Sequence, residues 1–119
     1  MAARPKLLIV ASDRAMRRSL AFVFEAEGYE VDVKPRLDAE LRPPAPSDLA
    51  RVAIVDEDAL TDRKSPEAEL ARLNRPVILL IERIRRPPAL PGLRIIEKPP
   101  LGRDLLDAVA AALEPDTST

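Results

Sequence analysis

The sequence contains no cysteine and no histidine. Without these side chains the protein has no thiol nucleophile, no disulfide and no imidazole base, and most types of zinc site are excluded. Any metal site must therefore consist of oxygen ligands, which favours Mg²⁺, Mn²⁺ or Ca²⁺. Lysine is also scarce, because only Lys6, Lys34, Lys64 and Lys98 occur among 19 basic residues. A lysine that ends a buried strand is therefore a candidate for a specific role.

Aromatic side chains make up 3% of the chain, and tryptophan is absent. A surface on which nucleotide bases stack is therefore not expected. The net charge of −1 gives no general attraction to nucleic acid or to an anionic membrane. No apolar run is long enough to cross a bilayer, and the first residues lack the pattern of a signal peptide. We therefore predict a cytoplasmic protein that binds neither nucleic acid nor a membrane.

The 119 residues suffice for one domain, and 46% of them are apolar, which allows a buried core. We expect a single domain over residues 1–119 that ends in a polar tail, residues 114–119. Short apolar runs predict five strands, at residues 6–10, 29–33, 52–55, 76–81 and 93–97. Helical patterns predict helices at residues 14–27, 66–73 and 103–113. Alternating strands and helices favour an α/β fold with a five-stranded parallel sheet, doubly wound and flavodoxin-like, in the order 2-1-3-4-5.

The predicted helices have clear ends and inner faces. Asp13 is a suitable N-cap for the helix at residues 14–27, and Gly28 is suited to ending it. The apolar residues expected to face inward are Met16, Leu20, Val23 and Phe24 in that helix, and Leu106, Val109, Ala110 and Leu113 in the last one. Phe22 lies off this stripe, as either a singly exposed aromatic or a contact point for a partner.

Two connections are too rich in proline for a regular helix. Residues 37–41 form at best a stunted helix, because three prolines follow within five residues. Between residues 82 and 92 the chain contains Pro87, Pro88 and Pro91, so the fourth crossover helix is predicted to be shortened or missing. An extended strap is expected there instead. Its Arg83, Arg85 and Arg86 are either solvated or a contact for an anion or an acidic partner.

The functional site is predicted at the carboxyl ends of the strands. The buried run at residues 52–55 is followed directly by Asp56, Glu57 and Asp58. In a sheet of order 2-1-3-4-5 the first and third strands are neighbours, so Ala11 and Ser12 end beside Asp56, and ligand sites form at such a point. Lys98 ends the fifth strand, and a cis peptide before the following proline is expected to turn it towards Asp56.

Over nearly its full length the chain resembles the receiver domain of two-component response regulators. The order and spacing of several segments carry the resemblance: Leu7-Leu8-Ile9-Val10, Met16-Arg17-Arg18, residues 25–31 (EAEGYEV), Asp56 after its apolar strand, Pro76-Val77-Ile78-Leu79, and Lys98-Pro99. The resemblance implies a phosphoryl-accepting aspartate, which Asp56 matches, and a lysine that contacts the phosphoryl group, which Lys98 matches. It also implies a pair of acids that bind Mg²⁺, a hydroxyl sensor and an aromatic switch residue. These three parts are replaced by Ala11 with Ser12, by Ile81 and by Ile95.

The loss of the acid pair has a direct chemical consequence. Phosphoryl transfer depends on positioning and charge neutralisation by a metal, and Mg²⁺ requires oxygen ligands that Ala11 cannot supply. Asp56 would have to hold the ion alone unless Asp13 or Asp58 assists. Asp13 has an alternative role as a helix cap, and Asp58 as a solvated loop acid. No cofactor is therefore expected, and Mg²⁺ is expected only if Asp56 is a phosphoacceptor.

Two functions are consistent with these residues. In the first, Asp56 and Lys98 form a structural ion pair, and the protein is an atypical receiver that acts by binding other proteins. In the second, a histidine kinase phosphorylates Asp56, so the only catalysis is self-catalysed phosphoacceptance. A flavodoxin-like nucleotide binder is a weaker third class, because no glycine-rich loop follows a strand.

The partners that the resemblance implies are signalling proteins. A histidine kinase or an effector domain is expected, contacted by Arg18, Ala21 and Phe22 of the helix at residues 14–27. The same helix is a candidate surface for a homodimer. Phe22 is the residue whose replacement is expected to weaken either association.

Overall fold

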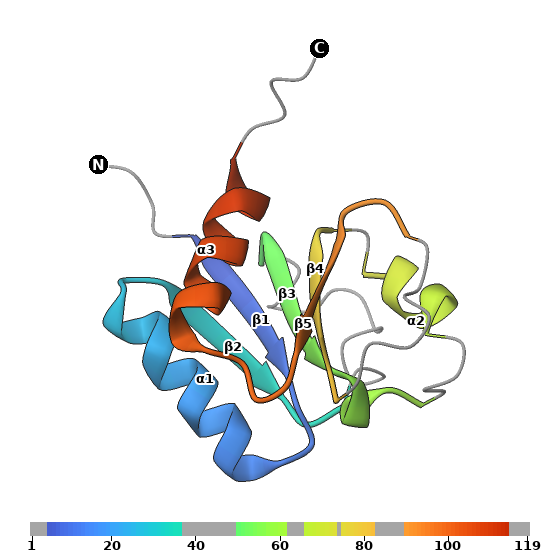
Figure 1. The fold of residues 1–119 in the computed structure, drawn as a ribbon, viewed down its shortest axis with the longest axis horizontal. Helices are drawn as coiled ribbons and strands as arrows, with labels where there is room; N and C mark the ends of the chain where they lie inside the picture. The colour runs from blue at the N-terminus through green and yellow to red at the C-terminus, as the bar shows by residue number, and fades with distance from the viewer. Residues whose placement is uncertain (1–4, 37–49, 62–65, 74, 83–89, 115–119) are drawn as a thin grey trace.

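The computed structural model describes residues 5–36, 50–61, 66–73, 75–82 and 90–114 (Figure 1). The described elements follow one another as β1 (Lys6–Val10), α1 (Arg14–Ala26), β2 (Glu30–Lys34), β3 (Val52–Asp56), the 3₁₀ turn η3 (Glu57–Ala59), α2 (Glu67–Ala71), β4 (Val77–Ile81), β5 (Leu93–Glu97) and α3 (Gly102–Leu113). All five predicted strands are present, with ends that differ from the prediction by at most one residue. The helix α2 ends at Ala71, two residues before its predicted end.

The strands form one parallel sheet in the order β2-β1-β3-β4-β5, as predicted (Figure 1). Every residue of the central strands β3 and β4 is buried, whereas the edge strands β2 and β5 contain no fully buried residue. The uniformly apolar sequences of β3 and β4 suit strands that are covered on both faces. The apolar content of the strands therefore distinguishes the inner strands from the two edge strands.

Helices cover both faces of the sheet. On one face, Leu20 and Phe24 of α1 and Leu105 and Val109 of α3 form a core with alternate residues of the inner strands. On the other face, Leu70 of α2 and residues of η3 pack against the remaining strand residues. The alternation places the carboxyl ends of β1, β3, β4 and β5 at one edge of the molecule, and the predicted site lies there.

The helix α1 agrees closely with its sequence pattern. The Asp13 carboxylate accepts the Ala15 N–H at 3.3 Å and so caps the helix, and Gly28 follows it with a φ of 95°. That positive φ favours glycine over any residue with a side chain. Phe22 is 73% exposed, which confirms that it lies outside the core stripe. Two features predicted for this helix, its cap and its apolar face, are therefore confirmed.

The inner face of α3 differs from the prediction in one position. Leu105 and Val109 are buried, while Ala110 is exposed and not inward as the pattern suggested. Leu105 and Leu106 are adjacent and both apolar, so periodicity alone does not decide which of them occupies the centre of the stripe. In the structure Leu105 is buried, and Leu106 is partly buried against the same core.

Some predictions fall outside the described residues. These are the stunted helix at residues 37–41, most of the strap at residues 82–92, and the arginines Arg83, Arg85 and Arg86. Among the residues that are described, no helix is long and apolar enough to span a bilayer.

Candidate functional site

Asp56 is the central residue of the site. It ends β3, it is 2% exposed, and it is the one buried charged residue within the described part of the chain. The pairing of Val10 with Val55 and of Asp56 with Leu80 places it between the ends of β1 and β4. Its Oδ1 accepts the Asp58 N–H at 3.1 Å, which caps the turn η3. The carboxylate is thus fixed by the strand before it and by the turn after it.

Lys98 provides the counter-charge. Its Nζ lies 2.9 Å from Asp56 Oδ1 and 3.5 Å from Asp58 Oδ2. Its backbone N–H donates to the Ile81 carbonyl at 2.7 Å, and the peptide bond to Pro99 is cis, as predicted. The predicted meeting of Lys98 with Asp56 is therefore confirmed. Asp58, expected to be a solvated loop acid, is 46% exposed but also contacts this lysine.

Opposing effects act on the charge of Lys98. Burial lowers the pKa of the Lys98 ammonium, but the hydrogen bond and the negative charge of Asp56, with a smaller contribution from Asp58, raise its pKa above the ordinary lysine value. The raised pKa means that the two carboxylates stabilise the charged form of Lys98 more than its burial destabilises that form. Lys98 is therefore charged at neutral pH, and the site contains its own cation.

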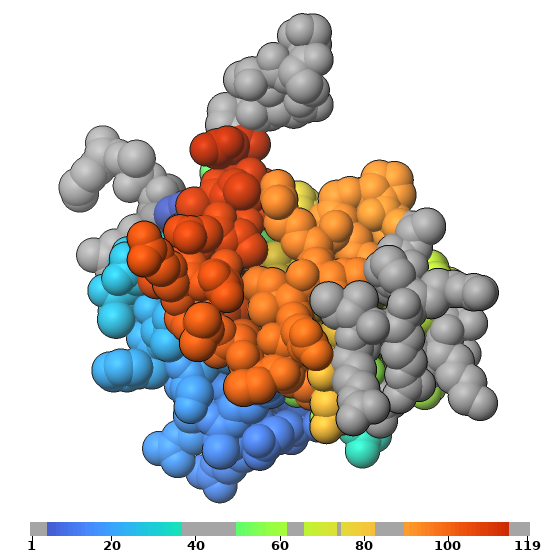
Figure 2. Space-filling model, viewed as in Figure 1, coloured from blue at the N-terminus to red at the C-terminus, as the bar shows by residue number. Residues whose placement is uncertain are grey.

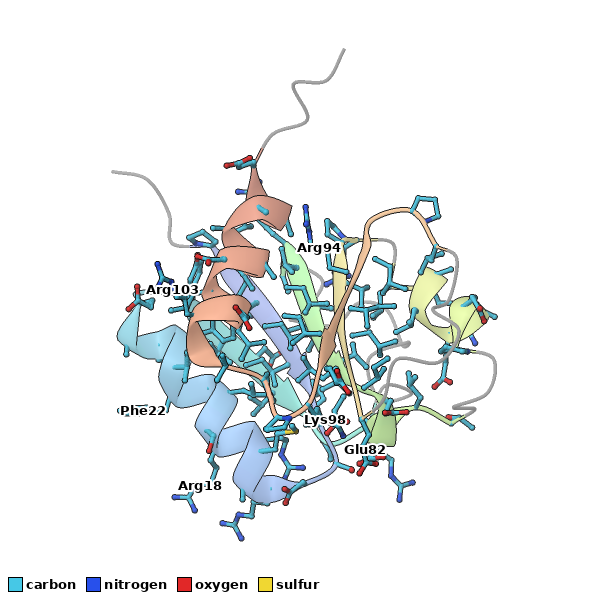
Figure 3. All side chains as sticks on the ribbon, viewed as in Figure 1. Arg18, Phe22, Glu82, Arg94, Lys98 and Arg103 are labelled. Carbon is cyan, nitrogen blue, oxygen red and sulfur yellow. The ribbon has the colours of Figure 1, made fainter. Side chains whose placement is uncertain are left out.

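Glu57 makes a contact that the sequence did not indicate. Its Oε2 accepts the backbone N–H of Glu82, the residue that follows β4. The side chain of Glu82 is exposed (Figure 3). The three consecutive acids therefore join the end of β3 to the ends of β4 and β5. No sequence pattern points to the Glu57 contact, because its donor is a backbone group.

The end of β1 carries no carboxylate towards Asp56. Ala11 is completely buried, and the next residue, Ser12, is exposed. The carbonyls of both residues accept hydrogen bonds from Arg17 Nη1, at 2.8 and 3.0 Å. Asp13 is engaged as the cap of α1. At the two positions where the resemblance to receiver domains implies a pair of acids, the chain thus has a methyl group and a hydroxyl.

These residues do not fit a magnesium ion. Mg²⁺ prefers six oxygen ligands in octahedral geometry, with at least one or two carboxylates. Across the described ranges, no group of three or more acidic, histidine or cysteine side chains could hold a metal ion. Asp56 Oδ1 is engaged by Lys98 and by the Asp58 N–H. An ammonium group bound to the same carboxylate competes with a cation for it.

The remaining switch positions are hydrocarbon. Ile81, at the end of β4, is 8% exposed and belongs to the core on the α2 face, where the partly buried Ile95 of β5 packs. An isoleucine cannot donate a hydrogen bond to a phosphoryl oxygen. At these two positions the chain therefore has side chains that pack in the core and offer no hydroxyl.

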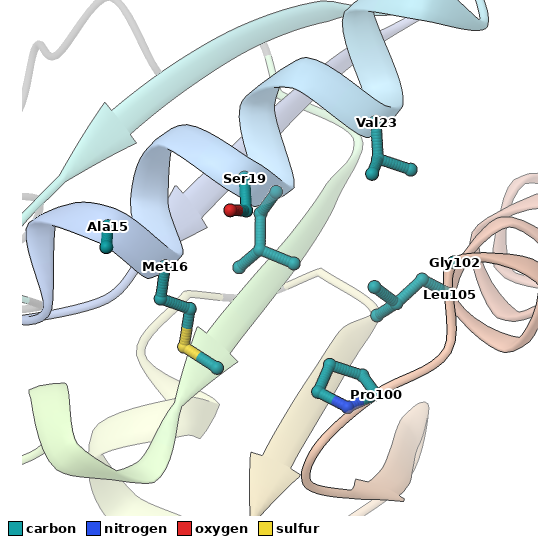
Figure 4. Close-up of a pocket in the computed structure, with 8 residues that line it drawn as sticks. Ala15, Met16, Ser19, Val23, Pro100, Gly102 and Leu105 are labelled. Atoms are coloured by element: carbon teal, nitrogen blue, oxygen red, sulfur yellow. The ribbon is translucent and has the colours of Figure 1, made fainter.

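A second feature is an apolar groove between α1 and the start of α3 (Figure 4). It has a volume of about 290 Å³ and is lined by Ala15, Met16, Ser19, Leu20, Val23, Pro100, Gly102 and Leu105. Gly102 faces Val23 across the groove: a Cβ at position 102 would lie 4.0 Å from Val23 Cγ1, which is an ordinary van der Waals contact. Figure 2 shows α3 and the preceding turn lying against α1 on this face.

Exposed apolar and basic side chains flank the groove. Phe22 is 73% exposed and Leu101, directly before α3, is 64% exposed. Arg18 and Arg103 are also exposed, and Figure 3 shows Arg18 and Phe22 projecting from α1 away from the sheet. Phe22 and Arg18 were predicted as contact residues, and the structure places them beside a groove. Ala21 is half-buried in α1 and does not line the groove.

Comparisons with known proteins agree on one family. No family model matches the chain. It is 32% identical over 106 residues to the transcriptional regulator protein FixT of Rhizobium meliloti (strain 1021), covering 87% of this chain and 88% of that protein. The signal receiver domain of an HD domain-containing protein from Pseudomonas fluorescens Pf-5 has a TM-score of 0.76, with 23% identity, 98% of this chain and 100% of the other covered. The receiver domain of the hybrid histidine kinase CckA has a TM-score of 0.70, with 20% identity and coverage of 92% and 99%.

Proposed function

Because the chain belongs to the receiver-domain family of response regulators, we propose that it is an atypical receiver that binds a signalling partner without magnesium-dependent phosphorylation. In this role the protein is a regulatory module and not an enzyme. The observation that carries the proposal is the composition of the site: Lys98 neutralises Asp56 at 2.9 Å, while buried Ala11 stands where a metal ligand is needed.

The surface proposed for partner binding is the groove between α1 and α3. An apolar groove between two helices suits a third helix that inserts apolar side chains at i, i+3, i+4 and i+7. Phe22 and Leu101 extend the apolar surface beyond the groove. An exposed aromatic beside a concave apolar surface is typical of an interface.

Charge defines the kind of helix that fits. The exposed arginines beside the groove, Arg18 and Arg103, favour acidic residues on the flanks of the bound helix. We therefore commit to an acidic amphipathic helix of a signalling protein, such as a histidine kinase or an effector domain. A second copy of this chain is the alternative occupant, through the same helix α1.

A peptide titration tests this surface. A synthetic acidic amphipathic helix is added to the isotope-labelled protein in EDTA and, separately, in Mg²⁺, and amide shifts are followed by NMR. We expect saturable shifts at Ser19, Val23 and Leu105, equal in both buffers, and none with a peptide of scrambled order. Phe22→Glu should abolish them, whereas Val33→Glu, at an exposed apolar residue of β2 outside the groove, should not.

Three results would overturn the proposed surface. Shifts confined to other residues would place the contact elsewhere, and a requirement for Mg²⁺ would contradict metal-independent binding. Sedimentation that shows a dimer lost in Phe22→Glu would replace the partner helix by a second copy of the chain.

Phosphoacceptance at Asp56 is the second candidate function. Both recorded contacts of its carboxylate fall on Oδ1, so among the described contacts Oδ2 has no hydrogen-bond partner. Oδ2 would attack the phosphorus of a kinase phosphohistidine, the P–N bond would break, and the leaving imidazole would take up a proton. Lys98 would then contact the acyl phosphate. Without a metal this transfer lacks most of its charge neutralisation and is expected to be slow.

A further inference from the structure

The ion pair and the groove are linked by a short segment of chain. Lys98, which contacts Asp56 and Asp58, is followed two residues later by Pro100, which lines the groove. Gly102 and Leu105, also in the groove wall, follow directly in α3. We define residues 98–101 as the connector.

The connector has few ways to absorb a displacement. Two of its four residues are prolines, whose φ angles are fixed by their rings. Its first residue is held at both ends, since the Lys98 N–H donates to the Ile81 carbonyl and its Nζ reaches two carboxylates. Its last residue, Leu101, is the N-cap residue of α3, and its carbonyl accepts the Leu105 N–H at 3.1 Å. A movement of Lys98 therefore reaches the first turn of α3.

The alternative route from the site lacks its usual parts. Ile81 and Ile95 cannot exchange hydrogen bonds with a group at Asp56. Glu57, the first residue of η3, reaches the end of β4 by accepting the backbone N–H of Glu82. Within the described residues, the connector is thus the shortest path along the chain from the ion pair, at Lys98, to the groove, at Pro100.

We propose that the Lys98–Asp56 ion pair positions the α3 wall of the groove, so that forming or breaking this pair controls binding in the groove. Lys98 is in this sense a positioning residue for the groove, which it does not line. By linkage, a partner helix in the groove stabilises the pair as much as the pair stabilises the bound helix. This inference deepens the proposed function and rests on the groove being a docking surface.

Amide hydrogen exchange of the free protein tests the proposal without any partner. Lys98→Met should raise the exchange rate of the Leu105 amide, which is bonded to the Leu101 carbonyl, and of the amides that follow it in α3 by about fivefold or more, because amide exchange reports local stability. The amides of Ser19 and Val23, in the opposite wall, should not change relative to wild type. Asp56→Asn, which breaks the pair from its other side but retains an acceptor for the cap, should give the same pattern.

The matched control is Glu57→Gln. It alters the neighbouring acid, whose contact leads to Glu82 and not to the connector, so α3 exchange should remain at the wild-type rate. The proposal is overturned if Leu105 exchange is unchanged in both pair variants, if both walls change equally, or if Glu57→Gln has the same effect. Failure of the peptide to bind would refute the docking surface but would leave this exchange pattern measurable.

Discussion

The carboxyl ends of adjacent strands in this sheet have opposite chemistry. At β3 and β5 the chain keeps a charged pair, Asp56 and Lys98, in contact at 2.9 Å. At β1 and β4 it has buried hydrocarbon, Ala11 and Ile81. The charged pair is held by further contacts, from the Asp58 N–H to Asp56 and from the Lys98 N–H to the Ile81 carbonyl. The presence of the aspartate and lysine therefore does not by itself indicate a phosphorylation switch.

The largest effect on the free energy of unfolding is expected from removing one charge of the Asp56–Lys98 pair. Lys98→Met leaves the buried Asp56 carboxylate without a counter-charge and should lower the free energy of unfolding by about 3 kcal/mol. Urea denaturation followed by circular dichroism measures the change. Lys34→Met, at the end of the edge strand β2, is the matched control and should change stability by less than about 0.5 kcal/mol.

A double replacement sharpens the same point. Asp56→Asn combined with Lys98→Met removes both charges but keeps the cap of η3, so most of the loss should be recovered. If the double variant is as unstable as Lys98→Met alone, the pair is not the source of the stability.

A smaller effect on the free energy of unfolding is expected from introducing carboxylates at the end of β1. Ala11→Asp together with Ser12→Asp supplies the missing carboxylates beside Asp56. At a Mg²⁺ concentration about ten times its dissociation constant, the ion should then add about 1.4 kcal/mol to the unfolding free energy. Thermal melts with Mg²⁺ or EDTA should differ for this variant but coincide for the wild type. A wild-type melt that shifts with Mg²⁺ would contradict the proposed loss of the metal site.

The sequence was sufficient to predict the charged pair and most of the fold. Parallel strands of uniform apolar content align Asp56 and Lys98 at one edge, so their contact follows from topology. The capping of α1 by Asp13 follows from local geometry in the same way. These features depend on residues close in sequence or on strand order.

Other features depend on how separate segments pack. The Glu57 contact requires the exact path of the chain after β4, and a backbone donor leaves no sequence signal. The groove depends on how far α1 lies from the start of α3, and residues of both helices line it. The choice between Leu105 and Leu106 depends on the rotation of α3, and the apolar pattern fits both.

The smallest effect concerns pH. The pKa of Lys98 is raised in the folded protein, so the stabilisation by its charge is complete below the ordinary lysine pKa of about 10.4 and is lost as the pH rises through the folded value. The stability difference between wild type and Lys98→Met should be constant from neutral pH to about pH 9 and shrink above about pH 10.4. Urea titrations of both proteins across this range measure it. A difference that grows at alkaline pH would contradict the assignment of the charge to Lys98.

The most direct test of the central claim is treatment of the protein with a small phosphodonor, acetyl phosphate, in Mg²⁺, followed by intact mass spectrometry. The site proposed here lacks the metal ligands and the sensor, so we expect the mass to remain that of the unmodified chain. A stoichiometric phosphoryl adduct that is released by alkali or hydroxylamine, as an acyl phosphate is, and that disappears in Asp56→Ala would contradict the account and establish Asp56 as a phosphoacceptor.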